Sequence, residues 1–280
     1  MRFSQLCDVQ KTNNNSQMSW FEALILGLIQ GLTEFLPVSS SGHLEIGKYL
    51  MNINPEKSLL FTVVVHGATV LSTIVVFWRD ILIILKGLFK FEWNTETKFA
   101  VKILISMIPV LIIGVFFKDQ VEGFFNGNMI FVGSMLLVTA AMLAFTYFSK
   151  SNKRELTYLD SFVIGLAQAM AVLPGISRSG ATISTGILLG DKKESVTRFS
   201  FLMVLIPILG ANFLDLMGGE MTSNESVGAI PLLVGFMAAF IAGWAACTWM
   251  INIVKKGKLI YFSFYCIIVG GVAIISGLYF

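Results

Sequence analysis

Charged side chains are scarce in this 280-residue chain: Asp, Glu, Lys and Arg make up only 13% of the residues, whereas hydrophobic residues make up 55%. Soluble globular proteins contain about 25% charged residues. The composition therefore excludes an ordinary soluble domain and favours a bundle of membrane helices surrounded by lipid. The net charge of +3 is spread along the chain without a basic patch, which excludes a nucleic-acid partner.

Cysteine is also rare, and the three cysteines give no disulfide framework. Cys7 lies in a polar tail, whereas Cys247 and Cys266 lie in apolar stretches and are expected to pack as small hydrophobic residues. Residues 1–17 lack the apolar core of a signal peptide. We expect them to form a disordered extension, with Met18 as the alternative natural start, and residues 18–280 to form a single membrane domain.

The chain has only six prolines, and one lies in each copy of a motif that occurs twice. Residues 19–42 read SWFEALILGLIQGLTEFLPVSSSG, and residues 157–180 read TYLDSFVIGLAQAMAVLPGISRSG. The copies align without a gap, which pairs Gly27 with Gly165, Gln30 with Gln168, Ser39 with Ser177, Ser41 with Ser179 and Gly42 with Gly180. This duplication predicts two repeats, about 18–150 and 157–280, with a site between them.

Long apolar segments predict six membrane-spanning helices, because each helix needs about 20 apolar residues to cross a bilayer. Four uninterrupted segments lie at about 58–78, 99–117, 129–148 and 229–250, and two more broken ones lie at about 196–216 and 258–279. The stretch 80–90 is apolar but short, which predicts an interfacial extension.

Each copy of the motif predicts a re-entrant helical hairpin. An apolar half, at 21–36 or 159–173, is followed by a proline and then by a shorter helical half that Ser39 or Ser177 would cap. A kinked ordinary helix is the alternative. One hairpin plus three spans makes an odd number of crossings in each repeat, so the second repeat would be inverted and the hairpins would meet near the membrane midplane.

The positive charges predict the orientation of this arrangement. Of the 20 Lys and Arg residues, fourteen would lie on one face, five on the other, and Arg178 within the second hairpin. The richer face is therefore predicted to be cytoplasmic, and both termini are predicted to lie outside.

The hairpins contain most of the polar groups expected inside the membrane, and ionisable groups at that depth usually mark a functional site. Gln30 and Glu34 lie one helical turn apart on one helix face, which suits a hard cation such as Mg²⁺ or Ca²⁺, or a carboxylate that orients a histidine. A buried ion pair between Glu34 and Arg178 that only links the hairpins is the alternative.

A phosphate is the anion that the rest of the motif suits best. Both short half-helices would direct their N-terminal N–H groups towards the midplane, and Arg178 adds a bidentate guanidinium. The candidate binding hydroxyls in the two hairpins are Ser39, Ser41, Ser177, Ser179 and Thr182. Helix capping and close helix packing are the alternative for the serines, and they are the favoured interpretation of Ser39 and Ser184.

Ser40 and His43 are candidates for a nucleophile and its base, because their spacing places them on neighbouring faces of a helical turn. The other histidine, His66, could line the cavity, but a packing role beside Gly67 is the favoured interpretation. Two pairs of glycines, each pair one helical turn apart, predict close contact between helices: Gly27 with Gly31, and Gly186 with Gly190.

The segments QGLTEFLPVSSSGH and LPGISRSGAT resemble the undecaprenyl-diphosphate phosphatase family, the bacitracin-resistance membrane proteins of bacteria. The resemblance extends from about Met18 to the C-terminus. It implies a divalent-cation-dependent enzyme of the bacterial plasma (inner) membrane, whose active site opens to the outer face. Its implied substrate is the polyprenyl diphosphate undecaprenyl diphosphate, and its product is the lipid carrier used for cell-wall polymers.

The resemblance also implies roles for individual residues. Gln30 and Glu34 match the family's Glu/Gln-x-x-x-Glu element, although the first position is often Glu, and a Gln cannot act as a base. Ser40 matches the proposed nucleophile, His43 the motif histidine, and Arg178 the arginine of the second motif.

Three questions stay open at this point. The nucleophile could be Ser40, with His43 as its base, or His43 could attack or activate water itself. Inverted repeats with broken helices are also typical of transporters, so a polyprenyl-phosphate flippase is the alternative function, and a lipid-binding scaffold without turnover is a third, less favoured one. A homodimer is an open option for the assembly.

Overall fold

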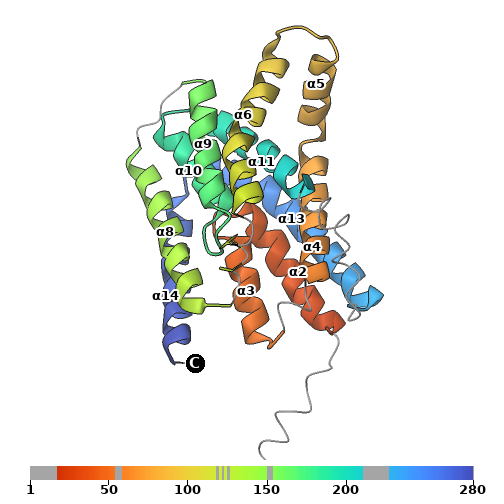
Figure 1. The fold of residues 1–280 in the computed structure, drawn as a ribbon, viewed down its shortest axis with the longest axis vertical. Helices are drawn as coiled ribbons and strands as arrows, with labels where there is room; N and C mark the ends of the chain where they lie inside the picture. The colour runs from red at the N-terminus through yellow and green to blue at the C-terminus, as the bar shows by residue number, and fades with distance from the viewer. Residues whose placement is uncertain are drawn as a thin grey trace, which may run out of the picture.

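The computed structural model describes residues 18–53, 59–117, 120–121, 123–124, 127–149, 154–210 and 227–279, so the predicted N-terminal extension lies outside the described residues. The described part is helical, as predicted, with one isolated β-bridge between Arg154 and Asp191 (Figure 1). Its helices are α2 (Trp20–Phe35), α3 (Ser40–Leu50), α4 (Leu59–Val76), α5 (Trp78–Leu88), α6 (Thr95–Phe116), α8 (Met129–Phe148), α9 (Tyr158–Met170), α10 (Arg178–Leu188), α11 (Lys193–Met203), α13 (Ala229–Lys255) and α14 (Ile260–Tyr279).

Four helices of the described residues, α6, α8, α13 and α14, are long and apolar enough to cross a membrane. A fifth span is possible if α4 and α5, which are bent by 75° at the break between them, count as one. The predicted span at about 196–216 is not a single long helix in the described part, because α11 contains Lys193, Glu194 and Arg198 and ends at Met203. Residues 211–216 lie outside the described residues. The described residues thus contain four or five candidate spans, which supports a multi-pass membrane protein.

The duplicated motif forms the same local structure twice. Helix α2 begins with a capping box between Ser19 and Glu22, and α9 begins with the equivalent box between Thr157 and Asp160. In each box the cap hydroxyl accepts a hydrogen bond from a backbone N–H of the first turn. The acidic side chain accepts one from the backbone N–H of the cap residue, so two donors that would otherwise be unpaired are satisfied.

The second halves of the motif are also equivalent, since α3 and α10 both have 11 residues. Ser39 and Ser177 are their N-caps, as predicted, and their hydroxyls accept from the N–H groups of Gly42 and Gly180. Local hydrogen bonds of the motif residues therefore form the break between the two halves of each hairpin. These bonds determine where each short helix begins.

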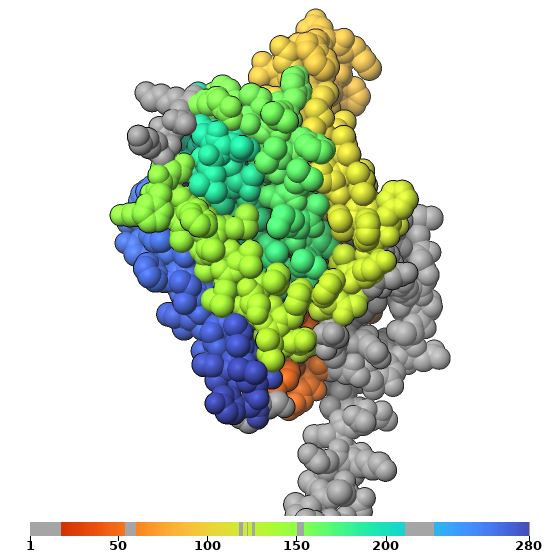
Figure 2. Space-filling view, turned by 60° about the vertical axis from the view of Figure 1, so that its left-hand side comes forward, coloured from red at the N-terminus to blue at the C-terminus, as the bar shows by residue number. Residues whose placement is uncertain are grey.

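Glycines let the first half of each motif pack closely on a long helix. A Cβ atom at Gly27 would lie 2.5 Å from the carbonyl oxygen of Gly235 on α13, and one at the equivalent Gly165 would lie 2.4 Å from the carbonyl oxygen of Ser106 on α6. Gly31 makes the same kind of contact with Ala239, which confirms the predicted close helix contact. Helices α8 and α14 lie side by side in Figures 1 and 2.

The tips of the two hairpins touch. The Ser179 hydroxyl donates to the Leu36 carbonyl oxygen at 3.2 Å, and a Cβ atom at Gly42 would lie 3.2 Å from the Cα atom of Gly175. Gly175 has a φ of 100°, a conformation that favours glycine. The two copies of the motif, which lie in opposite halves of the sequence, are thus brought into direct contact.

A charged cluster lies at the end of α9 and α10 away from these tips. Arg154 lies 2.7 Å from Asp160 and 3.4 Å from Asp191, and both carboxylates are buried. Burial, together with the neighbouring carboxylate of Asp160, raises the pKa of Asp191 to about 6, although Arg154 opposes the shift.

This pKa predicts that the protein loses stability as the pH rises. Because the pKa of Asp191 in the folded state lies above its ordinary value of 3.8, the folded state binds the proton more tightly. The protonated side chain stabilises the folded state fully below pH ~4. This contribution to the free energy of unfolding, roughly 2 to 3 kcal/mol, is lost as the pH rises to ~6 and above. Thermal unfolding in detergent should occur at a higher temperature at pH 5 than at pH 8, and Asp191→Asn should reduce that difference. An unchanged difference in the variant would contradict the assignment.

Candidate active site

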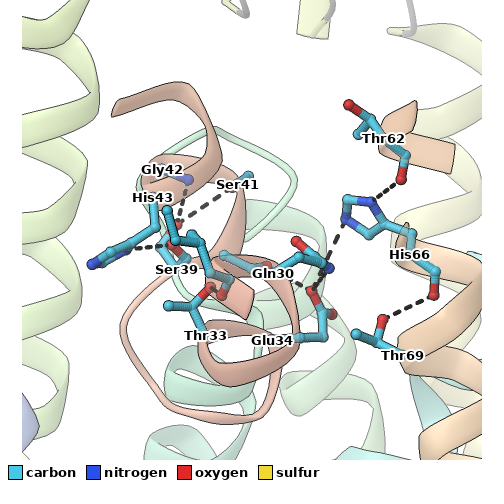
Figure 3. Close-up of polar contacts among 12 residues, drawn as sticks. Gln30, Thr33, Glu34, Ser39, Ser41, Gly42, His43, Thr62, His66 and Thr69 are labelled. Carbon is cyan, nitrogen blue, oxygen red and sulfur yellow. Dashed lines mark hydrogen bonds and ion pairs between the residues drawn. The ribbon is translucent and has the colours of Figure 1, made fainter. Parts of the chain in front are cut away.

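A single carboxylate oxygen organises the polar groups at the end of α2. Glu34 Oε2 accepts a hydrogen bond of 2.6 Å from the Ser40 hydroxyl. It also accepts one of 2.9 Å from Gln30 Nε2, and Figure 3 shows these two side chains side by side. The Glu34 side chain is only 9% exposed. A hydrogen bond of 2.6 Å from a hydroxyl to a carboxylate is short and charge-assisted, so the carboxylate is in position to accept the proton of Ser40.

The local backbone explains why Ser40 reaches Glu34. Gln30 and Glu34 are one turn apart on α2, and the chain then breaks at Leu36 and Pro37 and turns back. The cap residue Ser39 has a φ of 68°, whereas the equivalent Ser177 has a φ of −75°. A non-glycine residue at a positive φ stores strain that the surrounding structure must hold. The first hairpin is therefore strained at the residue that precedes the candidate nucleophile, and the second is not.

Arg178 faces the same small cavity as Glu34. The cavity is lined by both residues and by hydroxyl side chains from three helices, namely Thr69, Thr73, Ser179, Thr182 and Ser200. Within the described part of the chain, no acidic side chain lies within ion-pair distance of the Arg178 guanidinium. The structure therefore does not show the alternative, a direct ion pair between Glu34 and Arg178 that only links the hairpins. The guanidinium is available for an anion.

His43 makes its contacts away from this cavity. Its Nδ1 lies 2.8 Å from the carbonyl oxygen of Ser39, its Nε2 lies 2.9 Å from the hydroxyl of Tyr265, and the two rings are stacked. Figure 3 shows the ring directed to the opposite side from Glu34. A carbonyl oxygen can only accept, so Nδ1 carries the proton and Tyr265 donates to Nε2. Ser40 thus bonds to Glu34 rather than to the predicted partner, and a catalytic role for His43 stays a prediction.

The sequence favours a packing role for His66 over a position at the cavity, but the structure places this residue beside Glu34. Its Nε2 is 4.0 Å from Glu34 Oε2, and its Nδ1 is 2.8 Å from the carbonyl oxygen of Thr62 (Figure 3). The side chain comes from α4, whereas Glu34 lies on α2, so no local pattern in the sequence connects the two. The only available signal was that His66 is an ionisable residue in a predicted span.

Residues 23–272 match the family model described as bacitracin resistance protein BacA. The chain belongs to the BacA family. It is 60% identical over 263 residues to an undecaprenyl-diphosphatase of Bacteroides fragilis, a match that covers 92% of this chain and 98% of that protein. It is 55% identical over 260 residues to one of Christiangramia forsetii, covering 92% and 98%, and 38% identical over 271 residues to one of Salinibacter ruber, covering 92% and 99%.

The candidate binding hydroxyls of this BacA family member fall into two groups. Ser39 and Ser177 cap their helices, and each lies 3.3 Å from the second serine of its motif, Ser41 or Ser179. Ser179 and Thr182 line the cavity, and Ser200 donates to the Thr182 hydroxyl at 2.9 Å. The second hairpin therefore presents hydroxyls to the cavity, whereas Ser39 and Ser41 of the first hairpin are bonded to each other.

The predicted cation ligands lie side by side. Gln30 is fully buried, and its Oε1 has no hydrogen-bond partner among the described residues. The described part of the chain contains no group of three or more His, Cys, Asp or Glu side chains that could hold a metal ion by themselves. One carboxylate and one amide oxygen fit Mg²⁺ or Ca²⁺ when phosphate oxygens and waters complete the coordination.

Proposed function

We propose that the protein hydrolyses undecaprenyl diphosphate to undecaprenyl phosphate and inorganic phosphate, which recycles the lipid carrier for cell-wall polymers. One observation carries this proposal: the Ser40 hydroxyl donates to Glu34 at the edge of a cavity that the Arg178 guanidinium also lines. The names of the similar proteins support the same reaction. They favour hydrolysis over the alternative flippase, since each is called an undecaprenyl-diphosphatase.

The first step that the geometry supports is attack by Ser40 on the terminal phosphorus. Glu34 Oε2 already accepts the hydroxyl hydrogen bond at 2.6 Å and would take the proton. Arg178 would hold the diphosphate with its guanidinium, and the N–H groups at the start of α3 and α10 would add positive potential. Phosphoryl transfer depends mostly on such positioning and charge stabilisation.

A divalent cation, Mg²⁺ or Ca²⁺, would be held by Glu34 and by the amide oxygen of Gln30, which has no partner among the described residues. It would neutralise charge on the diphosphate. Ser179 and Thr182 would bind phosphate oxygens from the second hairpin, whereas Ser39, Ser41 and Ser177 would support the turns that place them.

The membrane arrangement that best supports this site has six spans and two re-entrant hairpins in an inverted repeat, within the plasma membrane of a bacterium. The matching capping boxes, the equal short helices and the contact between the hairpin tips support it. The termini and the entrance to the site would face outwards. A membrane-impermeant thiol reagent applied to whole cells should label a cysteine introduced at the exposed Leu50 but not one at Lys192. The reverse labelling pattern would show that the protein has the opposite orientation in the membrane.

Release of inorganic phosphate by the purified protein tests the proposed function. Undecaprenyl diphosphate in detergent should yield equal amounts of undecaprenyl phosphate and inorganic phosphate. If the protein binds the lipid or transfers it between vesicles but releases no phosphate, the result would support the flippase alternative and contradict the proposed hydrolysis. The same assay supports every prediction about activity that follows.

Removal of divalent cations should abolish turnover. We expect EDTA to reduce phosphate release at least about 100-fold, because the cation offsets the charge of the diphosphate in the transition state. Added Mg²⁺ or Ca²⁺ should restore it. Gln30→Leu removes the amide oxygen at nearly constant volume and should raise the cation concentration needed for half-maximal activity. Full activity in the presence of EDTA would show that the reaction does not require a divalent cation.

A further inference from the structure

We propose that Tyr265 of α14 is a positioning residue for the reaction. Through His43, it holds the backbone of Ser39 in its strained conformation, and that conformation presents the Ser40 hydroxyl to the Glu34 carboxylate. This inference rests on the proposed diphosphatase activity with Ser40 as its nucleophile. Tyr265 lies in neither copy of the duplicated motif.

The φ torsion of Ser39 determines how the candidate nucleophile meets its carboxylate. Glu34 precedes Ser39 in the chain and Ser40 follows it, so the relative orientation of their two side chains depends on this torsion. Ser40 donates to Glu34 at 2.6 Å while Ser39 has a φ of 68°. Rotation to the ordinary negative range would reorient α3 relative to α2 and separate the hydroxyl from the carboxylate. Because a serine at a positive φ is strained, other contacts must hold it there.

The duplicated motif provides an internal comparison that identifies such a contact. The hydroxyls of Ser39 and Ser177 both accept from the backbone N–H three residues later, and their carbonyl oxygens both accept from the N–H four residues later. The two turns differ at the next side chain: His43 Nδ1 lies 2.8 Å from the Ser39 carbonyl oxygen, whereas the equivalent Ala181 has no group that could donate. The turn with the positive φ therefore has the imidazole contact, and the turn with a φ of −75° does not.

Tyr265 fixes the imidazole in the position that this contact requires. Its hydroxyl lies 2.9 Å from His43 Nε2, and the two rings are stacked with their planes 11° apart. Because Nε2 accepts from the tyrosine, the proton lies on Nδ1, which donates to the Ser39 carbonyl oxygen. The next residue of α14 reaches the same turn, since Sγ of Cys266 lies 3.7 Å from the Pro37 carbonyl oxygen. A helix distant in the sequence therefore supports the turn of the first hairpin.

Both ring nitrogens of His43 are used in this arrangement. Nδ1 contacts the Ser39 carbonyl oxygen and Nε2 contacts the Tyr265 hydroxyl. A histidine that acts as a general base needs a nitrogen free to accept a proton from the reacting group. His43 therefore acts as a bridge between the turn and α14, which leaves Glu34 as the proton acceptor of Ser40.

Tyr265→Phe tests the proposal, because it removes one oxygen and keeps the stacked ring. The kcat for phosphate release should fall about tenfold, as expected for the loss of one hydrogen bond. KM for undecaprenyl diphosphate should stay within about twofold of the wild type, and phosphoserine at Ser40 should form more slowly by the same factor as kcat. Tyr261→Phe is the matched control: this tyrosine is exposed, one turn earlier on α14, and its substitution should leave the activity unchanged.

Two substitutions at Ser39 show whether Tyr265 acts through the backbone of this residue. Alanine and glycine both remove the cap hydroxyl, but only glycine adopts a positive φ without strain. In the Ser39→Ala background, Tyr265→Phe should again lower kcat at least about tenfold, whereas in the Ser39→Gly background the factor should be below about threefold. Equal factors in the two backgrounds would overturn the proposal.

Hydrogen exchange of the turn gives a readout that does not depend on catalysis. The backbone N–H groups of Gly42 and His43 donate to the hydroxyl and the carbonyl oxygen of Ser39, so their exchange rates report on its conformation. In the purified protein, Tyr265→Phe should raise these rates about tenfold, and Tyr261→Phe should not.

Unchanged exchange in Tyr265→Phe would also overturn the proposal. If the wild-type protein releases no phosphate, the diphosphatase function fails instead. The exchange measurement still decides in that case whether Tyr265 holds the turn, so the two failures are distinct.

Discussion

Alanine in place of Arg178 should lower kcat/KM for undecaprenyl diphosphate at least about 10³-fold, or about 4 kcal/mol of transition-state stabilisation. The reason is that the guanidinium lines the cavity with Glu34 and has no acidic partner among the described residues. No acidic side chain of the described residues therefore forms an ion pair with it before the substrate arrives. Removal of the side chain would leave the phosphoryl oxygens without their bidentate donor. Phosphate release over a range of substrate concentrations measures the effect.

Two further variants show which property of Arg178 matters. Arg178→Lys keeps the charge but loses the planar fork, so it should recover only part of the activity. Arg79→Ala removes an exposed arginine on α5, where the guanidinium lies over the Trp78 ring. It should stay within about threefold of the wild type, since surface substitutions have small effects. If Arg178→Ala and Arg79→Ala were equally active, Arg178 would have no role in binding the substrate.

The local structure of the hairpins could be predicted from the sequence because it depends on neighbouring residues. The position of Ser39 and Ser177 after a proline and before a helical run predicts two caps, and both hydroxyls accept from the first turns of α3 and α10. The gap-free alignment of the two motif copies also holds in the structure, since α3 and α10 begin at the paired positions Ser40 and Arg178. These features follow from short-range hydrogen bonding, which a sequence encodes directly.

The partners of the two histidines could not be predicted, because they depend on helices far apart in the sequence. Ser40 and His43 lie one turn apart in α3, but the Ser40 hydroxyl donates to Glu34 on α2, and Tyr265 on the distant helix α14 holds the His43 ring. His66 meets Glu34 only because α4 packs beside α2. The polar character of the site was therefore visible in the sequence, whereas the pairing of acid, base and nucleophile was not.

The number of spans shows the same limit. Hydropathy identifies α6, α8, α13 and α14 correctly, since each is a long helix that is apolar along most of its length. The predicted span at about 196–216 extends beyond α11, which begins with charged residues and has 11 residues, into residues 211–216 outside the described part, so it stays a prediction. A window average cannot detect where a helix breaks, and broken helices within a membrane are tolerated where they line a cavity. Residues of α11 and the turn after it, Ser200, Phe201 and Val204, line the cavity.

Replacement of Ser40 by alanine should also lower kcat at least about 10³-fold, because it removes the atom that attacks phosphorus. The substitution deletes one oxygen and leaves Arg178, Gln30 and Glu34 in place, so substrate affinity should change far less than turnover. The variant should form no phosphoserine after rapid mixing with substrate labelled in the terminal phosphate, whereas the wild type should. Ser134→Ala is the matched control: this serine bonds to the Ile130 carbonyl oxygen on the exposed face of α8.

The contact between Ser40 and Glu34 is what favours the serine over a histidine nucleophile. Attack by His43 would require its ring to leave both Ser39 and Tyr265, at 2.8 and 2.9 Å. Attack by Ser40 requires only the transfer of a proton along a hydrogen bond that already exists. Near-normal turnover of Ser40→Ala would reverse this conclusion, and Tyr265→Phe would then be expected to raise activity, since it releases the His43 ring from its hydrogen bond with the tyrosine hydroxyl.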